Sequence, residues 1–174
     1  VNVPVAVTIQ AAGVDDATLQ GFTTPVSLNA YSDIAATIGA GSNPWNFPLY
    51  TYYHDARTQT IYLASEIGTA GAISSLALDV TTVPGQVMNA WTIRMKHTPL
   101  SAYAPGNWES TGWTVVYQAN EHITSTGWVT FEFDTPFEYN GTDNLLIDFS
   151  FNNSSYTTTG QSSYSVPGNN RTLY

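Results

Sequence analysis

The stretch PWNFPLYTYYHDAR, residues 44–57, places five aromatic side chains beside a histidine, an aspartate and an arginine. The whole chain has five Trp and eleven Tyr. Sugar rings stack their apolar C–H faces on such side chains, and neighbouring polar groups bond the sugar hydroxyls. Trp45 and Tyr50 are therefore candidate ligand contacts. We interpret the following residues, 52–57, as a packed lead-in that closes the fold, with Asp55 and Arg57 forming an ion pair.

Two more loops carry large aromatic side chains. Tyr103 and Trp108 lie in a segment rich in Pro, Gly and Asn, and loop aromatics point to recognition more strongly than aromatics on an apolar strand face. Trp128 is out of phase with its apolar neighbours, so we expect it to face outward. Trp91 and Trp113 are in phase with apolar residues and are expected in the core. The alternative for the loop aromatics is that they cover the open ends of the fold.

Charged side chains supply further candidates on outward strand faces. Glu132 and Asp148 are expected there, with Arg94 and Lys96 as the basic residues that share such a face. They could bond sugar hydroxyls, or they could pair with one another across strands on a solvated sheet. Two carboxylates across a cleft would also suit glycoside hydrolysis.

Other reaction and metal chemistries find less support. The chain has no cysteine, its three histidines are far apart, and it has no G-x-S-x-G motif, so thiolate, zinc and serine-nucleophile sites are disfavoured. The oxygen-rich turn at residues 139–144, with Asp148 or residues 152–155, could hold a structural calcium ion or simply join two strands. No cofactor is required by the binding chemistry above.

Composition limits the partners. Only 10% of residues are charged, and the net charge is -9 with four basic residues, which disfavours nucleic acid and anionic membrane surfaces. No apolar run approaches the length of a membrane span, so no membrane insertion is expected. The chain begins at Val1 without a leader sequence, so we expect a processed secretory protein or a module excised from a longer chain.

The elements that would position these residues are strands. Apolar and polar residues alternate with period two over residues 60–67, 75–80, 91–97, 113–118, 128–133 and 144–151, with turn residues between them. No convincing helix is present, although residues 14–20 could form one short turn. The pattern predicts an all-β fold, an antiparallel β-sandwich with jelly-roll topology favoured, and a single domain over residues 1–174.

Three stretches together resemble a known kind of module: PLYTYYHDARTQTIYLASEIG, MNAWTIRMKHT and TGWVTFEFDTPFEYNGTDNLLIDFSFNNSS. They are similar to an accessory β-sandwich module of large, multimodular secreted and cell-surface bacterial proteins, over roughly residues 44–155. The resemblance implies a non-catalytic, exported bacterial module that is covalently linked to other domains. It implies no particular ligand.

The sequence therefore predicts a non-catalytic carbohydrate-binding module for a neutral or weakly charged polysaccharide. The expected ligand contacts are Trp45, Tyr50, Arg94, Lys96, Tyr103, Trp108, Trp128, Glu132 and Asp148. The alternative is a structural or adhesive cell-surface module that spaces domains or binds a protein. The third hypothesis is a small jelly-roll hydrolase or lyase with acidic residues on a concave face.

Overall fold

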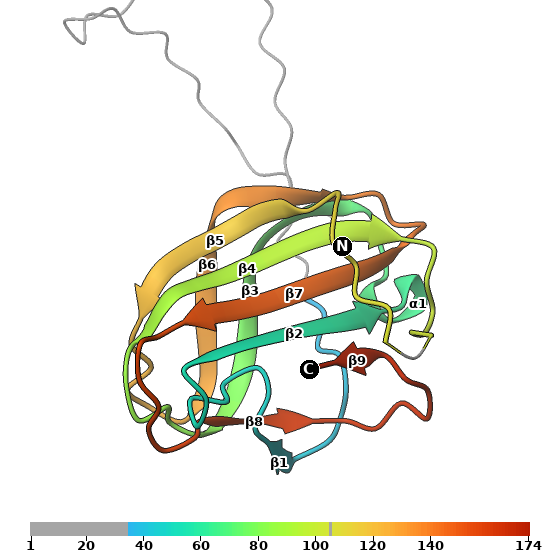
Figure 1. The fold of residues 1–174 in the computed structure, drawn as a ribbon. Helices are drawn as coiled ribbons and strands as arrows, with labels where there is room; N and C mark the ends of the chain where they lie inside the picture. Colours follow the sequence, from blue (N-terminus) through green and yellow to red (C-terminus); the bar gives the residue numbers. More distant parts are fainter. Residues whose placement is uncertain (1–34, 105) are drawn as a thin grey trace, which may run out of the picture. The chain divides into compact units, whose positions relative to one another are not determined.

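The computed structural model describes residues 35–104 and 106–174, and residues 36–174 form one compact unit (Figure 1). The earlier residues, including the turn expected at 14–20, lie outside the described part. The described strands are β1 (Asn43–Trp45), β2 (Asp55–Tyr62), β3 (Gly71–Thr82), β4 (Met88–Thr98), β5 (Thr114–Glu121), β6 (Gly127–Tyr139), β7 (Asn144–Asn152), β8 (Gln161–Tyr164) and β9 (Thr172–Leu173).

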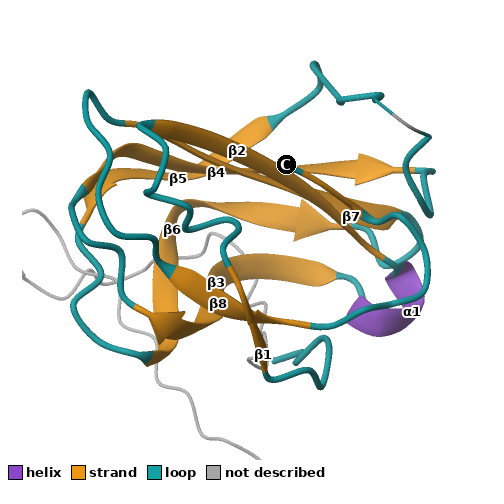
Figure 2. Ribbon diagram, turned by 60° about the horizontal axis from the view of Figure 1, so that its bottom comes forward, coloured by secondary structure: helices purple, strands orange, loops and turns teal. Residues whose placement is uncertain are grey.

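The strands form two antiparallel sheets, which lie as two layers in Figure 2. One sheet has the order β1-β8-β3-β6 and the other has the order β5-β4-β7-β2-β9. The all-β sandwich is therefore confirmed, whereas the jelly-roll topology stays a prediction. Among the described strands, every connection crosses from one sheet to the other except β4–β5. The β4–β5 loop, residues 99–113, starts and ends in the five-stranded sheet, so it can fold over that sheet's outer face.

The main core lies between the sheets and is built from the predicted inward positions. Trp91 and Ile93 on β4, Phe131 on β6 and Phe149 on β7 are almost completely buried. The Trp91 ring lies 5.8 Å from both phenylalanine rings, measured between centroids. Burial of these large apolar side chains is the main source of free energy for the fold.

One predicted strand ends earlier than the alternation suggests. β2 stops at Tyr62, and a short helix, α1 (Ala64–Ile67), follows it. The Glu66 carboxylate accepts a hydrogen bond from the Leu63 amide at 2.9 Å and so caps the first turn of α1. The strand predicted for residues 60–67 is wrong in its second half. There the hydrogen bond between Glu66 and Leu63 stabilises a helical turn, although the sequence alternates as in a strand. α1 has four residues, so no helix of the described part has the length needed to span a membrane.

β5 departs from the predicted alternation through a bulge. Ile93 pairs with Tyr117 while the next residue, Arg94, pairs with Val115, so Val116 is the extra residue on β5. Val116 and Tyr117 both pack against the main core, and Val115 is 49% exposed. The alternation over residues 113–118 predicts that Trp113 and Val115 both point into the core. Both positions are wrong, because the bulge inverts the faces on its N-terminal side.

The outer face of the five-stranded sheet carries a second, smaller apolar cluster. Ile61 on β2, Leu146 on β7 and Tyr103 in the β4–β5 loop are buried together. Trp113 packs against this cluster rather than against the main core. β7 is therefore buried on both faces, although its sequence alternates like a half-exposed strand.

Candidate functional site

An open cavity of about 630 Å³ is lined by side chains from four separate parts of the chain. They belong to the β1–β2 loop, the start of β2, the β4–β5 loop and the last described residue. The lining residues are Phe47, Tyr50, Tyr53, Asp55, Ala56, Arg57, Trp108 and Tyr174. We call this cavity the aromatic groove. Its volume lies within the ordinary range for small-molecule sites.

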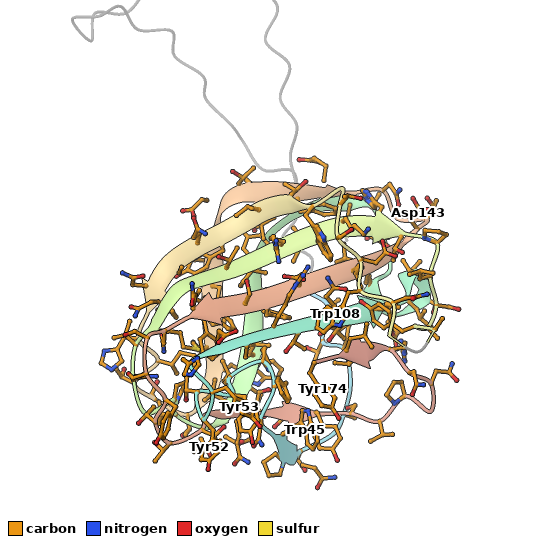
Figure 3. The ribbon with its side chains drawn as sticks, viewed as in Figure 1. Trp45, Tyr52, Tyr53, Trp108, Asp143 and Tyr174 are labelled. Atoms are coloured by element: carbon orange, nitrogen blue, oxygen red, sulfur yellow. The ribbon has the colours of Figure 1, made fainter. Side chains whose placement is uncertain are left out.

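Aromatic rings contact one another along the groove. The Phe47 ring lies 4.5 Å from the Tyr174 ring and 5.0 Å from the Tyr50 ring, and Tyr50 lies 4.9 Å from Tyr53, all between centroids. Trp45 on β1 adjoins the groove, with its ring 5.7 Å from that of Tyr174. Figure 3 shows Trp108, Tyr174, Tyr53 and Trp45 gathered in this part of the molecule.

The groove aromatics retain substantial solvent contact. Trp45 is 38% exposed, Trp108 is 39% exposed and Tyr174 is 62% exposed. These rings therefore present free surface to a ligand, in contrast to the fully buried Trp91 of the core.

Two charged side chains lie among these rings. The Asp55 carboxylate is 3.0 Å from Nδ1 of His54, and both side chains are exposed. Arg57 does not pair with Asp55, so the expected ion pair between them is wrong. Its Nε instead donates to Asp148 at 2.7 Å, and its guanidinium carbon lies 5.3 Å from the centre of the Trp108 ring. The groove thus combines stacking surface with one charged hydrogen-bond acceptor, Asp55, and one charged donor, Arg57.

A network of charges lies under the β4–β5 loop, next to the groove. Asp148 on β7 has no exposed surface, and it accepts hydrogen bonds from Arg57 on β2 and Arg94 on β4. Gln59 donates to the same carboxylate at 2.8 Å. Two cationic partners and four hydrogen bonds compensate the desolvation of this carboxylate, which a single partner would not do.

Several predicted ligand contacts belong to this covered region. Tyr103 is 6% exposed, and Asp148 is fully buried, so the expectation that either faces a ligand is wrong. Arg94 is bonded to Asp148, and Lys96 is bonded to the Glu109 carboxylate and the Thr111 carbonyl. Burial raises the pKa of the Tyr103 phenol above its ordinary value, so the hydroxyl stays protonated and donates to Gln59.

The other two predicted contacts lie on the four-stranded sheet. Trp128 and Glu132 are on the outward face of β6, where Trp128 is 65% exposed, as expected from its phase. Neither residue lines the aromatic groove. The structure therefore brings together Tyr50, Trp108 and the adjoining Trp45, and it separates them from the remaining candidates.

Several of the oxygen atoms considered for calcium already take part in hydrogen bonds within the protein. The Asn140 carboxamide oxygen accepts hydrogen bonds from Thr142 and Asp143, and its nitrogen donates to Asp143. Asp148 is occupied by arginines, and Asp143 lies far from the groove residues (Figure 3). Among the residues with described positions, no group of three His, Cys, Asp or Glu side chains gathers in a metal-binding arrangement. Calcium binding stays a prediction that a chelator would test.

The sequence analysis missed six groove residues: Phe47, Tyr53, Asp55, Ala56, Arg57 and Tyr174. The first five lie in the stretch 44–57, most of which the sequence analysis assigns to packing. Tyr174 is four residues beyond the turn-forming residues PGNN, 167–170, and carries no local signal of its own. Pairing of β9 with β2 places Tyr174 in the groove, and this contact joins residues more than 100 positions apart.

Comparison of the chain with known proteins finds no matching family model, no matching curated protein and no matching solved structure.

Proposed function

We propose that the chain is a non-catalytic carbohydrate-binding module that holds a neutral or weakly charged polysaccharide in the aromatic groove. The observation that carries the proposal is the convergence of Trp108, Tyr50 and Tyr174 around one groove, from three separate regions of the sequence. Exposed aromatic faces suit the C–H faces of sugar rings. Asp55 and Arg57 would bond hydroxyl groups at the edge of the bound sugar and fix its orientation.

Charge also supports a ligand of this class. The net charge of -9 repels polyanions over long range, and the Arg57 charge in the groove is shared with Asp148. A strongly sulfated polymer would gain little here. A neutral glycan avoids the repulsion and still uses the donors of Arg57.

The proposal includes no chemical step. Of the described residues that line the groove, Asp55 is the one acidic residue. Glycoside hydrolysis by the usual route needs two carboxyl groups on either side of the scissile bond. We further propose, from the resemblance and the composition, that the module belongs to a secreted or cell-surface bacterial protein with several domains.

The test is binding to a panel of neutral glycans. We expect native affinity electrophoresis in gels that contain glucan, xylan, mannan or galactan to show retardation by at least one polymer. Titration with cellohexaose, xylohexaose and mannohexaose should then alter Trp fluorescence, since Trp108 lies in the groove. Absence of both retardation and fluorescence change across the panel would refute the proposal and favour the structural or adhesive alternative. Release of reducing ends from any polymer would favour the hydrolase instead.

A further inference from the structure

Gln59 on β2 bonds the backbone of the loop that carries Trp108 at a single residue, Glu109. The Gln59 Nε2 donates to the backbone carbonyl of Glu109 at 2.7 Å, and the Glu109 backbone N–H donates to Gln59 Oε1 at 3.0 Å. One side-chain amide therefore bonds both polar backbone groups of one loop residue. This is the pattern by which a residue in an antiparallel sheet bonds its hydrogen-bonded partner.

The Gln59 side chain has no exposed surface, and all of its hydrogen-bonding capacity is used. Its second Nε2 hydrogen goes to Asp148, and its Oε1 also accepts from the Tyr103 hydroxyl at 3.3 Å. A carboxamide has two donors and two acceptor positions, so Gln59 is fully satisfied. Asp148 in turn is held by Arg94 and Arg57, which fixes the orientation of the Gln59 amide.

Glu109 follows Trp108 directly, so the fixed backbone of Glu109 determines where the Trp108 ring lies. The Arg57 Nη2 also donates to the Glu109 carbonyl, at 3.3 Å, while its guanidinium lies against the Trp108 ring. We infer that Gln59 is the positioning residue of the aromatic groove: by bonding Glu109 in the manner of a strand partner, it holds Trp108 at the groove wall. This inference depends on the proposed function in one respect only, namely that Trp108 contacts the ligand.

The test compares three variants of the full chain. In Gln59→Met the side chain keeps its length but loses all four hydrogen bonds. Gln59→Asn keeps the amide but is one methylene shorter, so it cannot reach Asp148 and Glu109 together. Glu109→Ala is the matched control, because it removes the ion pair with Lys96 but leaves both backbone bonds to Gln59 in place.

Two readouts do not depend on any glycan. Amide hydrogen exchange should show the Glu109 N–H protected in the wild type, and faster by about tenfold or more in Gln59→Met and Gln59→Asn. With 5-fluorotryptophan, the ¹⁹F signal of Trp108, assigned from Trp108→Phe, should shift or broaden in these two variants. The signals of Trp91 and Trp128 should stay unchanged, and Glu109→Ala should leave Trp108 unchanged.

The third readout is the dissociation constant for whichever of the three hexaoses binds the wild type. It should rise by about tenfold in Gln59→Met, and it should change by less than about twofold in Glu109→Ala. An unchanged Trp108 signal with unchanged Glu109 exchange in a folded Gln59→Asn or Gln59→Met variant would overturn the inference. Unprotected Glu109 exchange in the wild type would overturn it without any variant. If no polymer of the panel retards the wild type and no hexaose binds it, the proposed function fails, while exchange and ¹⁹F signals still decide the role of Gln59.

Discussion

The two sheets of the sandwich have outer faces with the same kind of sequence but opposite environments. On the four-stranded sheet, Trp128 and Glu132 project from β6 into solvent. On the five-stranded sheet, Leu146 and Asp148 occupy corresponding outward positions of β7, and both have no exposed surface. The difference is the β4–β5 loop, which covers only the second face.

Alternation of apolar and polar residues therefore assigns a side chain to one face of a sheet, but it does not determine whether that face is exposed or covered. On a covered outer face, apolar residues pack into a second core, and charged residues must be fully paired. Asp148 is paired with two arginines and bonded by a glutamine. Three of the chain's four basic residues, Arg57, Arg94 and Lys96, are engaged under or beside the loop.

The largest expected effect on stability comes from removing the buried carboxylate. Asp148→Ala should lower the free energy of unfolding by about 4 kcal/mol, because it leaves Arg94 partly buried without its partner. Urea unfolding at neutral pH measures this. Glu132→Ala, on the open face, is the control and should change stability by less than about 0.5 kcal/mol. Similar losses for both variants would show that the two faces do not differ.

Truncation of the second apolar cluster should have the next largest effect. Leu146→Ala should cost about 3 kcal/mol, because it opens a cavity between the sheet and the loop. Thr130→Ala, at an outward position of β6, serves as its control on the open face. If Leu146→Ala cost no more than this control, the loop would not be a true cover of the sheet.

The smallest effect concerns an ion pair that is only partly covered. Arg171, just before β9, bonds both oxygens of the Glu66 carboxylate in α1, at 2.6 and 3.0 Å. The hydrogen bond from Arg171 lowers the pKa of Glu66 below its ordinary value of 4.5. Because the folded pKa is the lower one, the pair stabilises the fold fully above about pH 4.5, and this stabilisation is lost as the pH falls through the folded pKa.

Comparison of the wild type with Glu66→Gln by urea unfolding at several pH values checks this prediction. The wild type should be more stable by no more than about 1 kcal/mol at pH 7, since the carboxylate is partly exposed. The difference should decrease below pH 4.5. A difference that grew as the pH fell would contradict the assignment.

Much of the fold could be predicted from the sequence, because the main core is built from local alternation. Trp91, Phe131 and Phe149 lie inside, as their phase indicates. The alternation failed at α1, where Glu66 caps a helical turn, and at Val116, where a bulge inverts the face of Trp113. Both wrong predictions have a local cause, a helix cap and a β-bulge, and the alternation of apolar and polar residues carries no information about either.

The candidate site was predictable only in part. Trp45, Tyr50 and Trp108 were singled out because of their residue types and their loops, and the structure brings them to one region. The prediction that Tyr103 and Asp148 contact a ligand is wrong, because the β4–β5 loop buries both side chains and the sequence does not show the path of this loop. Tyr174 could not have been found, since only the pairing of β9 with β2 places it in the groove.

The most direct test of the account compares two exposed tryptophans, one from each region. Trp108 lines the aromatic groove, whereas Trp128 lies on the open face of the other sheet and is the more exposed of the two. Isothermal titration calorimetry with the best-binding hexaose should show about a tenfold or greater loss of affinity in Trp108→Ala. Affinity in Trp128→Ala should equal that of the wild type. Unchanged binding in Trp108→Ala, or a loss confined to Trp128→Ala, would contradict the assignment of the groove as the glycan site.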